Sequence, residues 1–388
     1  MYTKPEPSYA TKRNPPNLDN HVVPLRGRGR GMTAAAGQRV VIIGGGYAGT
    51  ALARTLDGVA DVTLVDRKDV FFHRIASLRA AVEPEWTSRP FIAYDKLLVR
   101  GRFVRAAATG IDAERSIVTL DSGQALPYDA AVIATGAEAR DPARFTGATL
   151  PEAVAAMRGQ QQRIAQALSI LIVGGGPVGV ELAGEIRSAH PRKPVKLIQR
   201  QDSLLAGAQN PQLSERALRR LQAQDVTVRL GQRVSPSGGE SDRGELILWA
   251  VGNRPNTAWL ADDHPELLTP AGLVRVDAFL RVDRWSNVVA IGDVNDVPVG
   301  KLVLPAVAQA KTAAGNVKAA LDGSPSLTAH RPSDQKLLIV PIGPRDGVTM
   351  LPLSRQGIIA GSWTTRNLKG GNLLLPRYRK ALGQPSRT

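Results

Sequence analysis

The sequence lacks cysteine entirely, so none of its 388 residues can form a disulfide, ligate a metal through a thiolate or hold an iron–sulfur cluster. A redox-active cysteine pair is excluded for the same reason. The sequence also has no continuous apolar run of about 18 residues, so no transmembrane helix is expected. The N-terminal segment has no apolar signal-peptide core, and Tyr2 stands where N-myristoylation requires glycine. We expect a cytoplasmic protein, with weak peripheral membrane contact as the alternative.

Acidic side chains are also few: 34 Asp and Glu stand against 50 Lys and Arg, which gives a formal net charge of +16. Much of the excess lies at the two ends. Residues 1–31 carry six basic and two acidic side chains, and residues 366–388 carry six basic and no acidic ones. The alternation of Arg and Gly over 26–31 resembles RNA-binding tracts. Residues 1–37 lack apolar periodicity, however, so we predict a disordered basic tail and consider nucleic-acid binding unfavoured.

One arrangement of strand, glycines, helix and strand occurs twice. The first copy runs from Arg39–Ile43 through a helical pattern to Val62–Val65, and the second from Ser169–Val173 to Val195–Ile198. This duplication predicts an α/β fold with two Rossmann-like dinucleotide-binding domains and a small C-terminal α+β region. The predicted bounds are 38–144 with 270–328 for the first domain, 145–269 for the second, and 329–388 for the C-terminal sheet and basic tail.

Shorter patterns predict the other elements. Helices are expected at Pro211–Gln224 and near Pro305–Leu321, and strands at Val226–Leu230, Leu246–Val251, Leu273–Val276 and Val288–Ile291. Three alternating segments near the end, Lys336–Pro341, Gly347–Pro352 and Gly357–Trp363, predict an antiparallel sheet.

The glycines after the first strand match G-x-G-x-x-G at a helix start, with Tyr47 and Ala48 between them. Gly44 permits the tight turn, Gly46 lets a pyrophosphate approach the backbone, and Gly49 lets helix and strand pack closely. Asp66 ends the second strand, where its carboxylate can accept both ribose hydroxyls. Strand, glycines, helix, strand and acid agree, so we predict a dinucleotide site rather than a glycine-rich turn beside a surface aspartate.

The second copy has the same glycine spacing but a different end to its second strand. Its loop consists of Gly174, Gly176 and Gly179 with Pro177 and Val178. Gln199 and Arg200 follow the strand, so no acid stands at the position equivalent to Asp66. An acid there would favour NAD and repel a 2′-phosphate. We therefore hypothesise that NADPH is accepted. The alternative is that Arg200 is an ordinary solvated charge.

The motifs resemble, in their order, those of two-dinucleotide-binding flavoproteins of glutathione-reductase type. That order is Gly44–Gly49 with Asp66, Ala134-Thr135-Gly136, Gly174–Gly179 with Glu181, and Ala290-Ile291-Gly292-Asp293. Within that group the chain is similar to the apoptosis-inducing-factor-like proteins, and especially to their ferroptosis suppressor branch. The segments that carry this closer resemblance are Phe71–Arg74, Ser77–Glu83, Phe91–Tyr94 and Asp346–Val348.

The resemblance implies FAD in the first unit and NAD(P)H in the second. Hydride would pass from the nicotinamide to flavin N5, and electrons then to a quinone-like small acceptor. By position, Asp66 would bind the adenosine ribose, Asp293 the ribityl chain, and Glu181 would lie near the nicotinamide. The helix containing Pro305 would direct its N-terminal amides at the flavin. The remaining residues expected to contact a cofactor are Arg67, Arg79, Thr135, Gly136, Gly252, Gly292 and Ala306.

Two residues are candidates for catalysis, and no metal is expected. Glu181 matches the family carboxylate near the nicotinamide, the alternative being a polar residue paired with a neighbouring base. His73 is the one histidine beside a motif, so it is a candidate proton donor to a quinone, although a structural role beside the flavin is favoured.

The sequence leaves open the electron acceptor and the roles of the two chain ends. The acceptor could be a small redox protein such as a ferredoxin, docked by the basic ends, or the flavin could serve a redox-sensing nucleic-acid-binding protein. The segment Leu373–Lys380 could lie on an anionic membrane, although packing on the core is favoured because Pro376 interrupts a long helix. The segment between Arg233 and Leu246 is too short for the family's β-meander. The oligomeric state is also left open.

Overall fold

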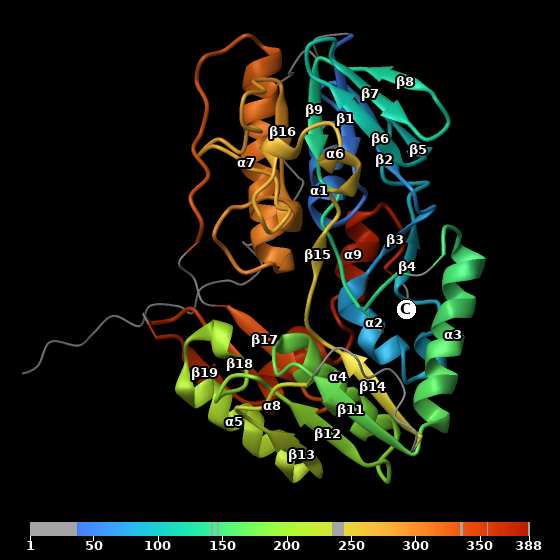
Figure 1. Cartoon of the computed structure of the whole chain (residues 1–388), viewed down its shortest axis with the longest axis vertical. Helices are drawn as coiled ribbons and strands as arrows, with labels where there is room; N and C mark the ends of the chain where they lie inside the picture. Colours follow the sequence, from blue (N-terminus) through green and yellow to red (C-terminus); the bar gives the residue numbers. More distant parts are fainter. Residues whose placement is uncertain are drawn as a thin grey trace, which may run out of the picture. The chain divides into compact units, whose positions relative to one another are not determined.

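Two parallel sheets and two three-stranded antiparallel sheets organise the part of the chain that the structure describes (Figure 1). The structure is a computed structural model. It describes residues 37–140, 143–145, 147–234, 244–333, 337–354 and 356–386. The predicted basic tail therefore lies outside the described residues, except for Gly37. Among the residues described, no helix is long and apolar enough to cross a bilayer.

The first sheet is five-stranded and parallel throughout. Its order is β16 (Val288–Ala290), β9 (Ala130–Ile133), β1 (Arg39–Ile43), β2 (Asp61–Asp66) and β5 (Arg102–Arg105). Val40 lies opposite Val62 on one side and Ala130 on the other. Val and Ile fill β1 because a central parallel strand is buried on both faces.

Different layers cover the two faces of this sheet. On one face, Val40 and Ile42 pack into the core that contains Leu52 of helix α1 (Tyr47–Leu56) and Ala313 of helix α7 (Val303–Leu321). On the other face, Val41 and Ile43 of β1 join the core built with an antiparallel sheet. That sheet consists of β6 (Ala108–Asp112), β7 (Ile117–Leu120) and β8 (Ala125–Pro127). The first βαβ unit, β1-α1-β2, is thus the centre of a three-layered body.

The second sheet is also parallel and has the order β13 (Val226–Arg229), β12 (Val195–Ile198), β11 (Ser169–Val173) and β14 (Glu245–Trp249). Helices α3 (Leu150–Gln166), α4 (Pro177–Ala189) and α5 (Pro211–Ala223) accompany it. The second βαβ unit is β11-α4-β12. These two sheets confirm the predicted α/β fold with Rossmann-like architecture.

A short two-stranded crossing and a terminal sheet complete the arrangement. The crossing pairs β10 (Ala137–Glu138) with β15 (Arg254–Pro255). The terminal sheet is antiparallel and consists of β17 (Leu338–Pro341), β18 (Gly347–Leu351) and β19 (Ile358–Ala360). It packs on α4 where Gly184 leaves room for Ile342, since a Cβ on Gly184 would lie 2.4 Å from the carbonyl carbon of Ile342.

The remaining elements are short. They are β3 (Val70–Phe72), β4 (Phe91–Ala93), α2 (Arg74–Ala80), α6 (Ala258–Ala261), α8 (Ser362–Thr365), α9 (Leu375–Ala381), the 3₁₀ turns η2 (Pro84–Trp86), η3 (Ala206–Ala208), η4 (Pro265–Leu267) and η5 (Gly292–Val294), and the π-helical turn η6 (Arg366–Gly370). Leu373, Leu375 and Leu382 are buried, so the C-terminal segment packs on the core, which is the arrangement that the sequence favours.

Several expected boundaries differ from those of the structure by one to three residues, and one expected strand is absent. Helix α7 begins at Val303, two residues before Pro305, because proline is tolerated in a first turn where the N–H has no helical partner. The last strand ends at Ala360, and Trp363 belongs to α8. Leu273–Val276 is no continuous strand; Val274 and Val276 form isolated bridges, to Leu268 and Asn295 and to Val282 respectively.

Candidate functional site

The first glycine turn, between β1 and α1, is tightly closed at both ends and open in the middle. Gly44 has φ +111°, and a Cβ on it would lie 2.4 Å from the Ala134 carbonyl oxygen. A Cβ on Gly49 would lie 1.9 Å from the Gly44 oxygen, whereas one on Gly46 would meet no atom within 4 Å. Gly46 precedes α1 without a side-chain cap, so the open space lies beside helix N–H groups that have no helical partner. This is room of the kind a pyrophosphate needs.

The second glycine turn, between β11 and α4, repeats the same geometry. Gly174 has φ +117°, and a Cβ on it would lie 2.5 Å from Cγ1 of Val251. A Cβ on Gly179 would lie 1.8 Å from the Gly174 oxygen, and one on Gly176 would meet nothing within 4 Å. Pro177 opens the helix, and Val178 remains 39% exposed beside it. The residues of both turns therefore fit a dinucleotide.

In both units, a side chain at the end of the second strand or directly after it accepts a hydrogen bond from the glycine turn. Asp66 Oδ2 accepts a hydrogen bond from the Gly45 N–H at 2.6 Å, and its Oδ1 accepts one from the Lys68 ammonium at 2.7 Å. Gln199 Oε1 accepts one from the Gly175 N–H at 3.0 Å. Gln199 thus occupies the place of Asp66, and it brings an uncharged amide.

The neighbours of these two residues point to solvent. Arg200 is exposed after β12. Arg67 is also exposed and lies 3.9 Å from a Glu138 carboxylate oxygen. Both arginines remain accessible to an anionic group of a ligand.

The ends of β9, β16 and α7 meet beside the first turn. The Cβ of Ala48 and that of Ala306 would lie 3.3 and 3.7 Å from a Cβ on Gly292. Asp293 follows in η5, half-buried, and burial raises the pKa of its carboxyl while Arg74 and Lys301 oppose the rise. Pro305 and Ala306 lie in the first turn of α7. The structure thus brings together the residues predicted around a flavin's ribityl chain.

Thr135 and Gly136 lie where the chain crosses between the two sheets. The Thr135 hydroxyl donates to the Asn256 carbonyl at 2.8 Å, and the Asn256 amide donates back to the Thr135 carbonyl at 2.8 Å. Gly136 has φ +66° and its carbonyl accepts from the Asn256 N–H at 2.9 Å. This reciprocal pairing fixes the crossing formed by β10 and β15.

Glu181 lies inside the molecule, one residue into the second turn of α4. Its Oε1 accepts a hydrogen bond from the Lys369 ammonium at 2.6 Å, and both side chains are largely buried. Burial raises the pKa of the Glu181 carboxyl, and the Lys369 ammonium partly offsets that rise. Nothing in the sequence pattern distinguishes Lys369 from the other basic residues near the C-terminus. It supplies the neighbouring base that the sequence leaves open for Glu181, and it does so from η6.

His73 is fully buried between Tyr47 of α1 and the C-terminal segment. Its Nε2 lies 2.8 Å from the Leu373 carbonyl oxygen, so Nε2 carries the proton and Nδ1 accepts from the Tyr47 hydroxyl at 3.0 Å. The Tyr378 ring lies 4.7 Å from the His73 ring. Burial lowers the pKa of His73 to about 4, so the ring is neutral near pH 7. This geometry supports the structural role of His73 rather than proton donation to an acceptor.

Arg79 is expected to contact a cofactor, but its contacts in the structure are with Glu185, Gly371 and Trp86 and not with either glycine turn. Its guanidinium forms two hydrogen bonds to Glu185, at 3.0 and 2.8 Å, and is 2% exposed. The structure therefore gives Arg79 a protein partner, on the helix that carries Glu181.

A basic cavity of about 540 Å³ lies along the edge strand β14, beside Gly252. The arginines that line it are Arg140, Arg144, Arg163 and Arg254. The Arg140 guanidinium lies 5.4 Å from the Trp249 ring centroid, and Arg144 pairs with Glu138 at 2.8 Å. The cavity offers a positive surface to an anionic ligand or partner. Across the described ranges, no group of three or more acidic or histidine side chains is placed to hold a metal ion.

Comparison with known proteins agrees with this geometry. Residues 38–314 match the family described as pyridine nucleotide-disulphide oxidoreductase. Apoptosis-inducing factor homolog B of Dictyostelium discoideum is 32% identical over 90% of this chain and 97% of its own length. Ferroptosis suppressor protein 1 of Homo sapiens is 30% identical over 89% and 96%. The structure of a sulfide:quinone oxidoreductase from Aquifex aeolicus shares the fold, with a TM-score of 0.70 at 17% identity over 90% and 93% of the two chains. The chain belongs to the pyridine nucleotide-disulphide oxidoreductase family, a family of FAD- and NAD(P)H-dependent oxidoreductases, and has apoptosis-inducing factor homologs and ferroptosis suppressor proteins among its relatives.

Proposed function

We propose that this chain uses NAD(P)H to reduce a quinone-like small acceptor, and that the buried pair of Glu181 and Lys369 serves the acceptor site. The observation that carries the proposal is this 2.6 Å pair, placed directly after the second glycine turn. Reducing a quinone to a quinol requires two electrons and two protons. A buried ammonium beside a carboxylate can stabilise charge on a quinone oxygen and supply a proton.

The proposal assigns each cofactor to one of the two glycine turns. Bound FAD would supply the hydride acceptor and the electron donor in one group. The turn at Gly46, with Asp66 and Asp293, would hold it. The turn at Gly176, with Gln199 and Arg200, would hold NADPH. The division into an FAD-binding part, 38–144 with 270–328, and an NAD(P)-binding part, 145–269, belongs to the same proposal and is supported by the pairing of β16 with β9.

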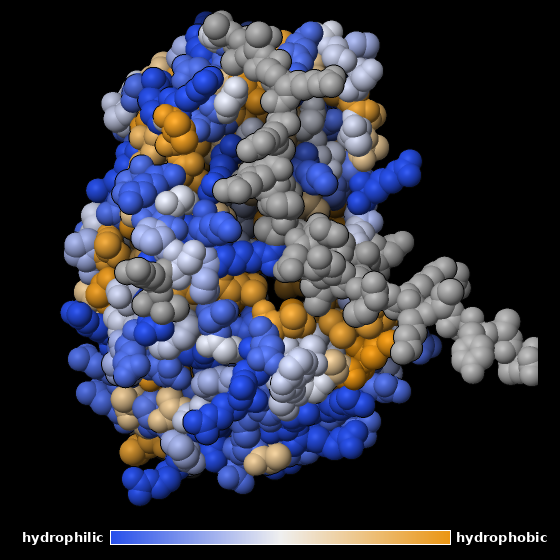
Figure 2. All heavy atoms as spheres, turned by 180° about the vertical axis from the view of Figure 1, so that it is seen from behind, coloured by the Kyte–Doolittle hydropathy of each residue, from blue (hydrophilic) through white to orange (hydrophobic). Residues whose placement is uncertain are grey.

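Two features favour a quinone over a dithiol relay. The sequence contains no cysteine, so electrons have no disulfide to enter. Leu302 and Leu304 at the start of α7 stay 43% and 39% exposed, which suits an apolar acceptor near the residues predicted to hold the flavin. Figure 2 shows that apolar side chains also gather in the middle of one face of the molecule. A sulfide:quinone oxidoreductase shares this fold, so the proposed chemistry has a precedent on this architecture.

The proposal is tested by separating reduction by NADPH from reoxidation by a water-soluble ubiquinone analogue. Lys369→Met should leave flavin binding intact and slow reoxidation about a hundredfold, since general acid–base groups contribute roughly 10²–10⁴-fold. Lys318→Met is the matched control, because Lys318 forms an exposed pair with Asp322 on α7. Equal reoxidation rates in both variants would contradict the role of Lys369.

A small acidic redox protein is a second candidate acceptor, and the arginine-lined cavity along β14 favours it. A guanidinium-rich surface steers acidic partners, and such steering weakens with salt. Reduction of a ferredoxin that falls steeply between about 50 and 500 mM NaCl, with no quinone reduction at any salt concentration, would favour this candidate.

A further inference from the structure

Arg79 and Glu185 form a buried ion pair that the chemistry proposed above does not use. Arg79 lies on α2, and its Nε and Nη2 donate to the two carboxylate oxygens of Glu185 at 3.0 and 2.8 Å. Both side chains are about 2–3% exposed. Replacing a buried pair by apolar residues is often neutral or stabilising, so such a pair is weak evidence of a purely structural role.

The guanidinium is held in one orientation by further contacts. It lies 5.0 Å from the Trp86 ring centroid, and its Nη1 donates to the Gly371 carbonyl at 3.4 Å. Gly371 follows directly after η6, the turn that carries Lys369. Arg79 therefore contacts both the helix of Glu181 and the segment of Lys369.

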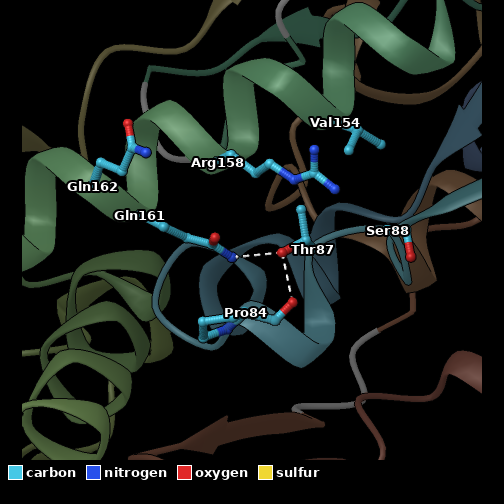
Figure 3. Close-up of a pocket in the computed structure, with 7 residues that line it drawn as sticks. All are labelled: Pro84, Thr87, Ser88, Val154, Arg158, Gln161 and Gln162. Carbon is cyan, nitrogen blue, oxygen red and sulfur yellow. Dashed lines mark hydrogen bonds between the residues drawn. The ribbon is translucent and has the colours of Figure 1, made fainter.

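Gln161 of α3 bonds both to the end of α2 and to Thr87 beside η2, and Figure 3 shows its contact with Thr87. The Gln161 amide donates to the Thr87 hydroxyl at 2.9 Å and to the Ala80 carbonyl at 2.6 Å, at the last residue of α2. Thr87 in turn donates to the Pro84 carbonyl at 2.6 Å. These contacts close one wall of a cavity of about 460 Å³ and cap the helix that carries Arg79. These hydrogen bonds hold α2 in place, and α2 positions Arg79 against α4.

Glu181 and Glu185 are four residues apart on α4 and so share one helix face. Each has its own cation from a different segment: Lys369 of η6 for Glu181, and Arg79 of α2 for Glu185. A Glu83 carboxylate oxygen also lies 3.9 Å from Arg79 Nε. The Lys369 ammonium helps to lower the pKa of His73. Two carboxylates in a dry environment repel each other and compete for the same cations.

We propose that Arg79 and Glu185 are positioning residues, which fix Glu181 in its contact with Lys369 by giving the second carboxylate a partner of its own. The inference rests on the proposed function of the Glu181–Lys369 pair. Without Arg79, the Glu185 carboxylate would be left unpaired and would draw Lys369 away from Glu181. Without Glu185, the unpaired guanidinium would act on Glu181 directly.

The two single replacements should therefore move the titration of Glu181 in opposite directions. Arg79→Met removes a cation that lowers the pKa of Glu181, so that pKa should rise. Glu185→Gln removes a neighbouring anion and frees the guanidinium, so the pKa of Glu181 should fall. The measurement is carbon NMR of the glutamate carboxyls in the oxidised holoprotein, with the Glu181 signal assigned by its loss in Glu181→Gln. Removal of a nearby charge alone would also shift this pKa, so the positioning role is decided by kcat in the single and double variants.

Activity supplies a second readout. Misplacing Glu181 should lower kcat for quinone reduction about tenfold to a hundredfold in both variants, with a smaller change in KM for NADPH. Glu83→Gln is the matched control: it removes the other carboxylate near Arg79, which is 30% exposed, and should stay within about twofold of the parent.

The double variant Arg79→Met/Glu185→Leu keeps the proposal falsifiable if a single variant fails to fold, because it leaves no unpaired buried charge. It should fold and keep a kcat close to that of the parent, because no unpaired charge remains to compete for Lys369 or to act on Glu181. A folded double variant that loses kcat as strongly as the single variants would overturn the positioning role. Unchanged kcat in both single variants would overturn the positioning role if Lys369→Met slows reoxidation, and would overturn the function proposed for Glu181 if it does not.

Discussion

Gln199 accepts a hydrogen bond from the Gly175 N–H at 3.0 Å, in the place where Asp66 accepts one from the Gly45 N–H at 2.6 Å. The two units therefore share one geometry and differ by one charge. A carboxylate at this place binds ribose hydroxyls and repels a 2′-phosphate, whereas an amide permits the phosphate. In dinucleotide-binding folds, the residue at this position influences coenzyme preference.

Gln199→Glu should move the coenzyme preference toward NADH. The new carboxylate can still accept from Gly175 but repels the 2′-phosphate, so kcat/KM for NADPH should fall about tenfold relative to that for NADH. Arg200→Ala should lower kcat/KM for NADPH in the same sense. The measurement is the ratio of kcat/KM for the two coenzymes. Ratios identical to those of the parent in both variants would contradict a 2′-phosphate site.

Replacing glycines of the second turn should separate folding from coenzyme binding. Gly176 has φ −74° and open space at its Cβ, so Gly176→Val should fold with Tm within about 3 °C of the parent and raise KM for NADPH about tenfold or more. Gly179→Val places a Cβ 1.8 Å from the Gly174 oxygen and should destabilise the fold by several kcal/mol. Thermal unfolding and steady-state kinetics distinguish the two. An unchanged KM in Gly176→Val would show that no phosphate occupies this space.

His73 should make the protein less stable in acid. Burial lowers the pKa of His73 from 6.5 to about 4, so the unfolded state binds the proton first as pH falls. The neutral ring makes its full contribution to the free energy of unfolding above pH 6.5, and this contribution is lost as the pH falls toward 4. The loss should amount to about 2.5 kcal/mol between pH 7.5 and 4.5. Urea unfolding at both pH values measures this loss. His73→Asn should lose less stability over this pH range, because it has no imidazole to protonate. An equal pH dependence in the parent and the variant would contradict the account.

Local motifs were the part of the site that sequence could predict. The glycine turns, Asp66 and the amide at Gln199 depend on residues a few positions apart or on repeated βαβ spacing, so their pattern is visible in the chain. Contacts between distant segments leave no such pattern. Lys369 lies 188 residues from Glu181, and no periodicity indicates that a basic residue of the C-terminal segment enters α4's site.

The same reason explains why two residues near the motifs have unexpected partners. Arg79 meets Glu185 across 106 residues, and His73 meets the Leu373 carbonyl across 300. Both stand beside a motif in the sequence, but their partners come from tertiary packing. The predicted FAD and NAD(P)H contacts, the domain bounds and the catalytic residues remain predictions.

The absorbance of the purified holoprotein tests the central claim most directly. Flavin bands near roughly 370 and 450 nm should bleach on anaerobic addition of NADPH and return when a ubiquinone analogue is added. A matched addition of an oxidised ferredoxin should restore the bands more slowly than the quinone does. Bands that bleach with NADPH but do not return with any quinone would contradict a quinone reductase, and a protein without flavin bands would contradict the account as a whole.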